Sequence, residues 1–95
     1  MGRLEGRVAV ITGSSSGMGL ATTELFVAEG ARVLACDIND AVGMDLEARF
    51  PGRVKHQHCD VMREADIEAA MQAAVDVFGG LDIVFNNAGS GGSPQ

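Results

Sequence analysis

The stretch from Val8 to Gly19, VAVITGSSSGMG, constrains the fold of this chain more than any other. Its first four residues are apolar without alternation, which is typical of a parallel strand buried on both faces. Three glycines, Gly13, Gly17 and Gly19, follow at once and lead into a segment with helical spacing of apolar residues. Because a strand of this kind needs helices on both sides of its sheet, we expect an α/β fold.

The glycine-rich turn has two interpretations. A strand, a turn with three glycines and a helix can bring backbone N–H groups and a helix N-terminus to a pyrophosphate, with no Cβ atoms in the way. A Gly/Ser loop before an ordinary helix is the alternative. A mononucleotide P-loop is disfavoured because Leu20 and Ala21 follow Gly19 where that loop needs Lys and Ser or Thr, and the G-x-G-x-x-G spacing is absent as well.

The rest of the chain alternates between strands and helices. We expect strands at residues 7–12, 32–36, 54–59 and 81–85, and helices at residues 18–29, 39–50 and 64–78. In the first helix the apolar residues at helical spacing are Met18, Ala21, Leu25 and Ala28. The order βαβαβαβ implies a parallel sheet with right-handed crossovers. No internal boundary or repeat is visible, so residues 1–95 are interpreted as part of one domain, with 89–95 as a loop or a disordered tail.

Composition excludes several classes of partner. The 95 residues, 46% hydrophobic and 21% charged, are typical of one small globular domain. The formal net charge of -6 and the scattered basic residues argue against nucleic acid and against an anionic membrane surface. The apolar runs are too short to span a bilayer, and no basic segment leads into an apolar one at the N-terminus, so we expect a soluble, cytoplasmic protein.

The histidines and cysteines do not suggest a metal site. His56 and His58 share one face of the third strand, but no carboxylate or thiol stands at a convincing spacing, so surface histidines are favoured over a metal pair. This more polar strand suits the edge of a sheet. Cys36 and Cys59 also lack metal spacing, and free buried thiols are favoured over a disulfide.

Polar residues follow the strands at the edge where the glycine turn is expected. Asp37 ends the second strand, close to the offset of about 20 residues from the first glycine at which a carboxylate binds an adenosine ribose. Its charge repels a 2′-phosphate, and Ser15, Ser16 and Ile38 supply no Arg or Lys to attract one, so NAD is favoured over NADP. The alternative is a solvated loop aspartate.

Asp60 ends the third strand and Asn87 follows the fourth. Because the carboxyl ends of parallel strands share one edge, we expect Gly13, Asp37, Asp60 and Asn87 to converge on one crevice. Taken singly, Asp60 could equally cap the following helix and Asn87 could be only a turn former.

Four motifs together resemble the N-terminal half of a short-chain dehydrogenase/reductase. They are TGSSSGMG at Thr12–Gly19, Asp37, CDV at Cys59–Val61 and NNAG at Asn86–Gly89. The resemblance implies a partial Rossmann fold, with a sheet of order 3-2-1-4 and only the third helix on one face. It also implies a longer, homo-oligomeric parent that transfers hydride between NAD and a secondary alcohol or ketone.

The resemblance also implies the residues that contact the cofactor. They are Gly13, Ser16, Gly17, Met18, Gly19, Asp37, Asp60, Val61, Asn87, Ala88 and Gly89. By this resemblance Ser16 and Met18 lie on the pyrophosphate side, and Asp37 holds the adenosine ribose. Asp60 meets the adenine amino group, with Val61 beside it.

At the fourth strand the same resemblance implies that Asn87, Ala88 and Gly89 line the cofactor cleft and that Asn86 ties the central strands together.

The chain departs from the family in its catalytic residues. Family members use a serine, a Tyr-x-x-x-Lys pair and a further asparagine that lie beyond NNAG, whereas this chain has no tyrosine and its one lysine, Lys55, is on the third strand. We therefore assign no catalytic residue and no metal ligand. A fragment of an NAD-dependent oxidoreductase is the first hypothesis. A non-catalytic nucleotide-binding or interaction module and a non-functional truncated product are the alternatives. We also expect the isolated chain to be weakly stable or to aggregate, because its fourth strand is an uncovered edge.

Overall fold

A computed structural model of the chain describes residues 2–15 and 17–87. Within these residues the elements follow the predicted order βαβαβαβ. The strands are β1 (Val8–Thr12), β2 (Arg32–Asp37), β3 (Val54–His58) and β4 (Ile83–Asn86), and the helices are α1 (Gly17–Ala28), α2 (Asp40–Arg49) and α3 (Glu64–Phe78). The predicted tail at 89–95 lies outside the described residues.

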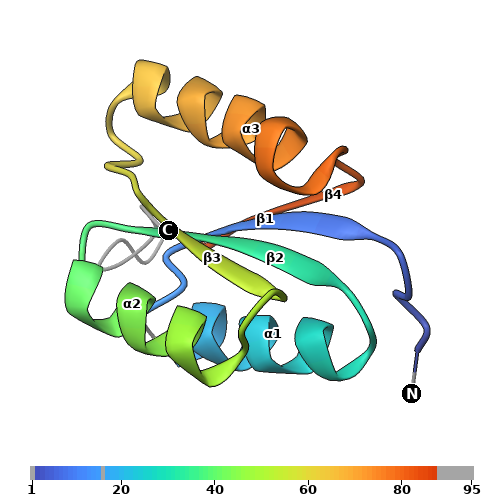
Figure 1. Ribbon diagram of the computed structural model, residues 1–95. Coiled ribbons are helices and arrows are strands. Elements are labelled where there is room, and N and C mark those ends of the chain that lie inside the picture. The colour runs from blue at the N-terminus through green and yellow to red at the C-terminus, as the bar shows by residue number, and fades with distance from the viewer. Residues whose placement is uncertain (1, 16, 88–95) are drawn as a thin grey trace.

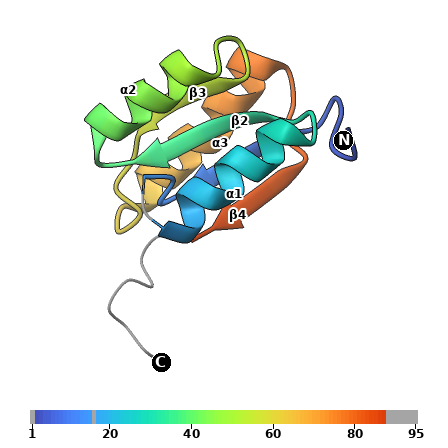
Figure 2. The same cartoon turned by 90° about the horizontal axis from the view of Figure 1, so that it is seen from below.

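The strands form one parallel sheet in the order β3-β2-β1-β4, which confirms the expected partial Rossmann fold. Helices α1 and α2 cover one face and α3 covers the other, as Figure 1 shows. Seen from the α1 and α2 side, α2 lies beside β3 while α1 runs along β1 and β2 (Figure 2). The sheet therefore has β3 and β4 as its edge strands. The more polar third strand, predicted to lie at an edge, is β3.

The core lies in two layers, one on each face of the sheet. Beneath α3, strand residues such as Val10 and Leu34 pack against Ala70 and Ala74, whose small side chains let the helix approach the sheet. On the other face the core consists of Ala9, Ile11, Val33, Ala35, Leu46 and Val54. All five residues of β1 are buried, as its unbroken apolar run predicts.

The ends of two helices also agree with the sequence. The Val42 N–H donates to Asn39 Oδ1 at the start of α2 (3.2 Å), which identifies Asn39 as the N-cap. Gly79 ends α3 with a φ of +86°, and its N–H donates to the Val75 carbonyl (2.8 Å). The prediction that the fourth strand begins at Leu81 is wrong, because Asp82 does not pair with β1 in the regular ladder. Its carboxylate accepts from the Val8 N–H (2.9 Å), so the regular ladder begins at Ile83.

Helix α1 presents a different face to the sheet from the one that its apolar spacing suggests. Met18 and Leu25 are 66% and 57% exposed, while Leu20, Phe26 and Val27 pack against the core. Gly19 explains this rotation: a Cβ there would overlap the carbonyl of Gly13, so this position lies directly against the turn that ends β1. The close approach orients the helix and leaves an apolar stripe facing solvent.

The prediction of two surface histidines on β3 is wrong for one of them. His58 is 59% exposed, but the side chain of His56 is only 9% exposed because it lies beneath the first turn of α2. Asp40, too far away in the sequence to be noticed from spacing, contacts both rings. The two cysteines are free and buried, as expected. Among the described helices, none is long and apolar enough to cross a bilayer.

Candidate functional site

The carboxyl ends of the four parallel strands lie along the same side of the sheet, which we call the carboxyl edge. Three of the predicted residues are brought together there. The Asn87 side-chain amide donates to the Gly13 carbonyl (3.3 Å), which joins the end of β4 to the glycine turn. The Ser15 N–H donates to Asp37 Oδ2 (3.2 Å), which joins the same turn to the end of β2. Gly13, Asp37 and Asn87 therefore lie around one short turn.

The glycine turn is anchored by β2. Gly13 has a φ of +68°, a conformation that side chains disfavour, and it directs the chain from β1 toward α1. The backbone N–H of buried Ser14 donates to the Cys36 carbonyl (3.2 Å), and its hydroxyl donates to the same oxygen (3.3 Å). Both bonds hold the turn against β2, and α1 begins at Gly17 with no acidic residue in its first turn. Such a helix N-terminus is suited to an anion.

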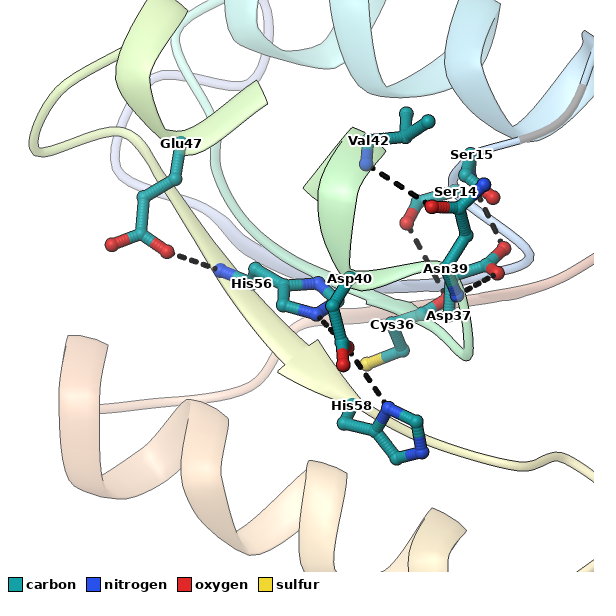
Figure 3. A network of polar contacts seen from close by, with 10 residues as sticks. All are labelled: Ser14, Ser15, Cys36, Asp37, Asn39, Asp40, Val42, Glu47, His56 and His58. Atoms are coloured by element: carbon teal, nitrogen blue, oxygen red, sulfur yellow. Dashed lines mark hydrogen bonds and ion pairs between the residues drawn. The ribbon is translucent and has the colours of Figure 1, made fainter. Parts of the chain in front are cut away.

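Asp37 is held as an acceptor at the end of β2. Its Oδ1 accepts from the Asn39 N–H (2.9 Å) and its Oδ2 from the Ser15 N–H, and Figure 3 shows the two bonds fanning out from one carboxylate. Partial burial alone would raise the pKa of Asp37, but hydrogen bonds from Asn39, Ser15 and Ile38 outweigh it and lower the pKa below its ordinary value. The group is therefore a carboxylate at neutral pH.

Asp60 and Val61 lie one strand further along the edge. The Cys59 N–H donates to the Asp37 carbonyl (3.1 Å), so the end of β3 adjoins the end of β2. Asp60 Oδ1 accepts from the Met62 N–H (2.9 Å), whereas the N-cap position of α3 is Arg63. Asp60 therefore shapes the loop and does not cap the helix. Val61 packs partly against the core beneath α3.

Thr12 joins β1 to β4; it begins the TGSSSGMG motif but was not among the residues expected to contact the cofactor. Its hydroxyl donates to Asn86 Oδ1 (2.8 Å) and accepts from the Asn87 N–H (3.0 Å). Asn86 thus ties the central strands, as the resemblance implied. Apart from that motif, the sequence shows only a threonine between a buried strand and the first glycine, which by itself is common.

The remaining predicted residues divide into two groups. Gly17, Met18 and Gly19 form the first turn of α1, where Met18 is exposed and Gly19 is buried. Ser16, Ala88 and Gly89 lie outside the described residues. Within the two described segments, no group of three or more His, Cys, Asp or Glu side chains is arranged to hold a metal ion.

The side chains at this edge can form hydrogen bonds and carry charge, but the nearby cysteine, Cys36, does not supply a thiolate. Burial, with smaller contributions from Cys59 and the negative charge of Asp37, raises the pKa of the Cys36 thiol to about 12. Cys36 is therefore a protonated thiol at neutral pH. The edge offers the ionised carboxylate of Asp37, backbone N–H groups and a helix N-terminus, which suit a ligand with hydroxyl groups and negative charge.

Comparison with known proteins agrees with this arrangement. Three relatives align with nearly the whole chain. Momilactone A synthase from Oryza sativa subsp. japonica is 50% identical over 93 residues, which is 97% of this chain and 34% of that protein. Tropinone reductase-like 1 from Erythroxylum coca is 47% identical over 92% of this chain and 32% of that protein. (+)-Borneol dehydrogenase 1 from Salvia officinalis is 45% identical over 92% of this chain and 34% of that protein.

The chain spans about a third of the length of these curated relatives. A family model described as short chain dehydrogenase matches residues 7–95, which include the glycine turn, Asp37 and the end of β4. With nearly the whole sequence matched and the sheet order that the motifs require, the chain belongs to the short chain dehydrogenase family.

Proposed function

We propose that this chain forms the NAD-binding portion of an oxidoreductase that transfers hydride between NAD and a secondary alcohol or ketone. The observation that carries the proposal is the bond between Asp37 and the Ser15 N–H. It puts an ionised carboxylate, which suits ribose hydroxyls, next to a glycine turn and a helix N-terminus, which suit a pyrophosphate. The relatives named as a dehydrogenase and a reductase-like protein support an oxidoreductase.

The glycine turn and the start of α1 lie so close together that no side chain fits between them. A Cβ on Gly19 would overlap the Gly13 carbonyl and lie 3.0 Å from the Asn87 amide nitrogen. In the proposal Gly13, Ser16, Gly17, Met18 and Gly19 surround the phosphates through this turn.

Asp37 accepts hydrogen bonds from the adenosine ribose in this proposal. The 2′-phosphate of NADP would lie against this carboxylate and be repelled by it. The neighbouring described residues Ser14, Ser15 and Ile38 offer no positive charge to neutralise that phosphate. NAD is therefore proposed over NADP. Asp60 and Val61 serve the adenine.

In the proposal Asn87, Ala88 and Gly89 line the cofactor cleft. Bound NAD supplies the hydride acceptor at C4 of its nicotinamide. The described residues bind and orient, and none is assigned a role in proton transfer. Turnover is proposed for the complete protein, since this chain spans about a third of its relatives.

The test is calorimetric titration of NAD and NADP into the protein and into two matched variants. Asp37→Asn keeps the shape of the side chain but removes its charge, and we expect NAD affinity to fall about tenfold, as for loss of a hydrogen bond to a charged group. Discrimination against NADP should also decline. Asp45→Asn, the same change at an exposed position of α2, should leave both affinities unchanged. Absence of NAD binding by the unaltered protein would contradict the proposal, and tighter NADP binding would contradict the preference.

A non-catalytic nucleotide-binding module is the second candidate. The observation that favours it is composition: the 95 residues contain no tyrosine, the residue that serves as acid and base in the family resembled here. The intact mass of the polypeptide recovered from its source separates the two. A mass near 9.8 kDa favours the module. A much heavier protein that contains a Tyr-x-x-x-Lys pair favours the oxidoreductase.

A further inference from the structure

One carboxylate accepts hydrogen bonds from two histidines next to the proposed ribose site. Asp40 Oδ1 lies 2.6 Å from His56 Nε2 and 2.9 Å from His58 Nδ1. Figure 3 shows both rings, carried by β3, directed at this side chain on the first residue of α2. The three residues, which we call the histidine clamp, join the edge strand to the start of the helix that follows Asp37.

His56 is the fixed member of the clamp. Its ring lies against Gly43, where a Cβ would overlap Nδ1 and lie 2.5 Å from Cε1 and Cγ. Its backbone N–H donates to Glu47 Oε1 (2.9 Å), a second link between β3 and α2. Nδ1 is a buried atom without a hydrogen-bond partner, so the arrangement assigns the ring proton to Nε2, from which it donates to Asp40.

His58 is the exposed histidine of the clamp, and its ring bonds the Asp40 carboxylate. The hydrogen bond to Asp40 and the charge of that carboxylate raise the pKa of His58 above 6.5, against a small opposing effect of burial. Asp60 and Asp66, on the loop and helix that follow β3, raise it further. Hydrogen bonds from His56 and His58 lower the pKa of Asp40 below 3.8. The remaining charged groups of this face, Glu47 and Lys55, pair with each other (3.4 Å).

The clamp is continuous with the ribose carboxylate through Asn39. The Asn39 N–H donates to Asp37 Oδ1, and its side chain accepts from the Val42 N–H. Asp40, the next residue, is held by the two rings. The segment 37–40 is therefore a tight turn, with the proposed ribose ligand at one end and the clamp at the other. Asp40 is therefore joined to Asp37 through the adjacent residue Asn39 and the hydrogen bond that its N–H donates.

We propose that Asp40, His56 and His58 are positioning residues that orient Asp37 for the ribose, and that protonation of His58 tightens this orientation and so strengthens NAD binding. This inference rests on the proposed function, because it concerns how the same site is regulated. None of the three is a catalytic residue. The clamp acts through the turn at 37–40.

The direction of the pH effect follows from the two ionisations. A raised pKa of His58 means that its ion pair with Asp40 is complete below pH 6.5, and that the positive charge of this pair is lost as the pH rises through the raised value. A lowered pKa of Asp40 means that its contribution is present above pH 3.8 and is lost as the pH falls through the lowered value. The charged pair therefore exists between these limits, and NAD binding should weaken as the pH rises from slightly acid to slightly alkaline.

The experiment measures NAD affinity by calorimetry between about pH 5.5 and about pH 8.5, the range in which an exposed histidine titrates. We expect the dissociation constant of the unaltered protein to rise about threefold, the scale of an exposed ion pair. His58→Gln should show the weaker affinity at every pH, with a flat profile. Asp40→Asn should weaken binding at low pH although it removes a negative charge, whereas Asp45→Asn on the same helix should not.

The comparison of the two aspartate variants separates positioning from simple charge. If the charge of His58 merely attracted the anionic ligand, Asp40→Asn would bind at least as tightly as Asp45→Asn, and the proposal would be overturned. Identical pH profiles for the unaltered protein and His58→Gln would overturn it as well. Imidazole resonances followed by NMR give a readout without ligand: the titration of His58 should move to lower pH in Asp40→Asn. A protein that binds no NAD at any pH overturns the proposed function and this inference together, whereas pH-independent NAD binding overturns this inference alone.

Discussion

Replacement of Gly43 with alanine tests whether the His56 ring determines the residue required in α2. The new methyl group would overlap Nδ1 and lie 2.5 Å from two ring carbons. The ring has little freedom to withdraw, because its side chain is 9% exposed and its Nε2 is bonded to Asp40. Either the ring leaves the helix or the helix moves away from β3.

The magnitude follows from two opposing effects. Alanine in a helix interior is favoured over glycine by about 1 kcal/mol. Forcing an extra methyl group into a filled site costs about 1–3 kcal/mol, and a ring confined in this way belongs near the upper end of that range. We therefore expect Gly43→Ala to lower the free energy of unfolding by about 2 kcal/mol. In a His56→Ala background the overlap is absent, and the same change should raise it by about 1 kcal/mol.

The assay is urea denaturation followed by far-ultraviolet circular dichroism on the four proteins of this cycle. Gly17→Ala is a matched control, since a Cβ there would meet nothing within 4 Å. The reversal of sign between the two backgrounds is the result that matters. If Gly43→Ala is neutral or stabilising while His56 is present, the ring does not occupy the space that the structure gives it, and His56 is not a buried member of the clamp.

Three further predictions concern the glycine turn and its surroundings. Gly19→Ala should abolish NAD binding in calorimetry, because the Cβ would overlap the Gly13 carbonyl, which as backbone cannot swing aside. Thr12→Val should lower the free energy of unfolding by about 1–3 kcal/mol and speed hydrogen exchange in β4, since it removes both hydrogen bonds from the buried hydroxyl, including the one to Asn86. Cys36, with a pKa of about 12, should resist a disulfide reagent in the folded protein at mildly alkaline pH and react only after unfolding; rapid labelling without unfolding would contradict its burial.

The sequence predicted the order of the elements because the strongest local signals are present at each boundary. β1 and β2 are unbroken apolar runs, and Asn39 and Gly79 stand where helix caps belong. The convergence of Gly13, Asp37 and Asn87 also follows from sequence, since the carboxyl ends of parallel strands share an edge. The prediction that the isolated chain aggregates remains untested. Its premise is visible in β4, an edge strand in which Val84 is exposed.

The parts that sequence reasoning missed depend on contacts between distant residues. Apolar spacing in α1 favoured the face with Met18 and Leu25, but the helix is oriented by the backbone contact between Gly19 and Gly13, which no periodicity reveals. The partner of the two histidines was missed because Asp40 lies on another element and approaches β3 only after the sheet and α2 have packed.

Gly43 is the one residue in the sequence that indicates the close packing of α2 against β3. A glycine in the first half of a helix is locally unfavourable. The structure shows what offsets this disadvantage: the vacancy at Gly43 admits the ring of His56, and the ring in turn bonds the aspartate three residues before the glycine. The glycine in α2 is therefore explained by the histidine on β3, which needs the space. The position of the histidine is in turn explained by the aspartate one turn before the glycine, which its ring bonds. These residues stand beside the proposed ribose carboxylate, so a change at Gly43 should alter NAD affinity as well as stability.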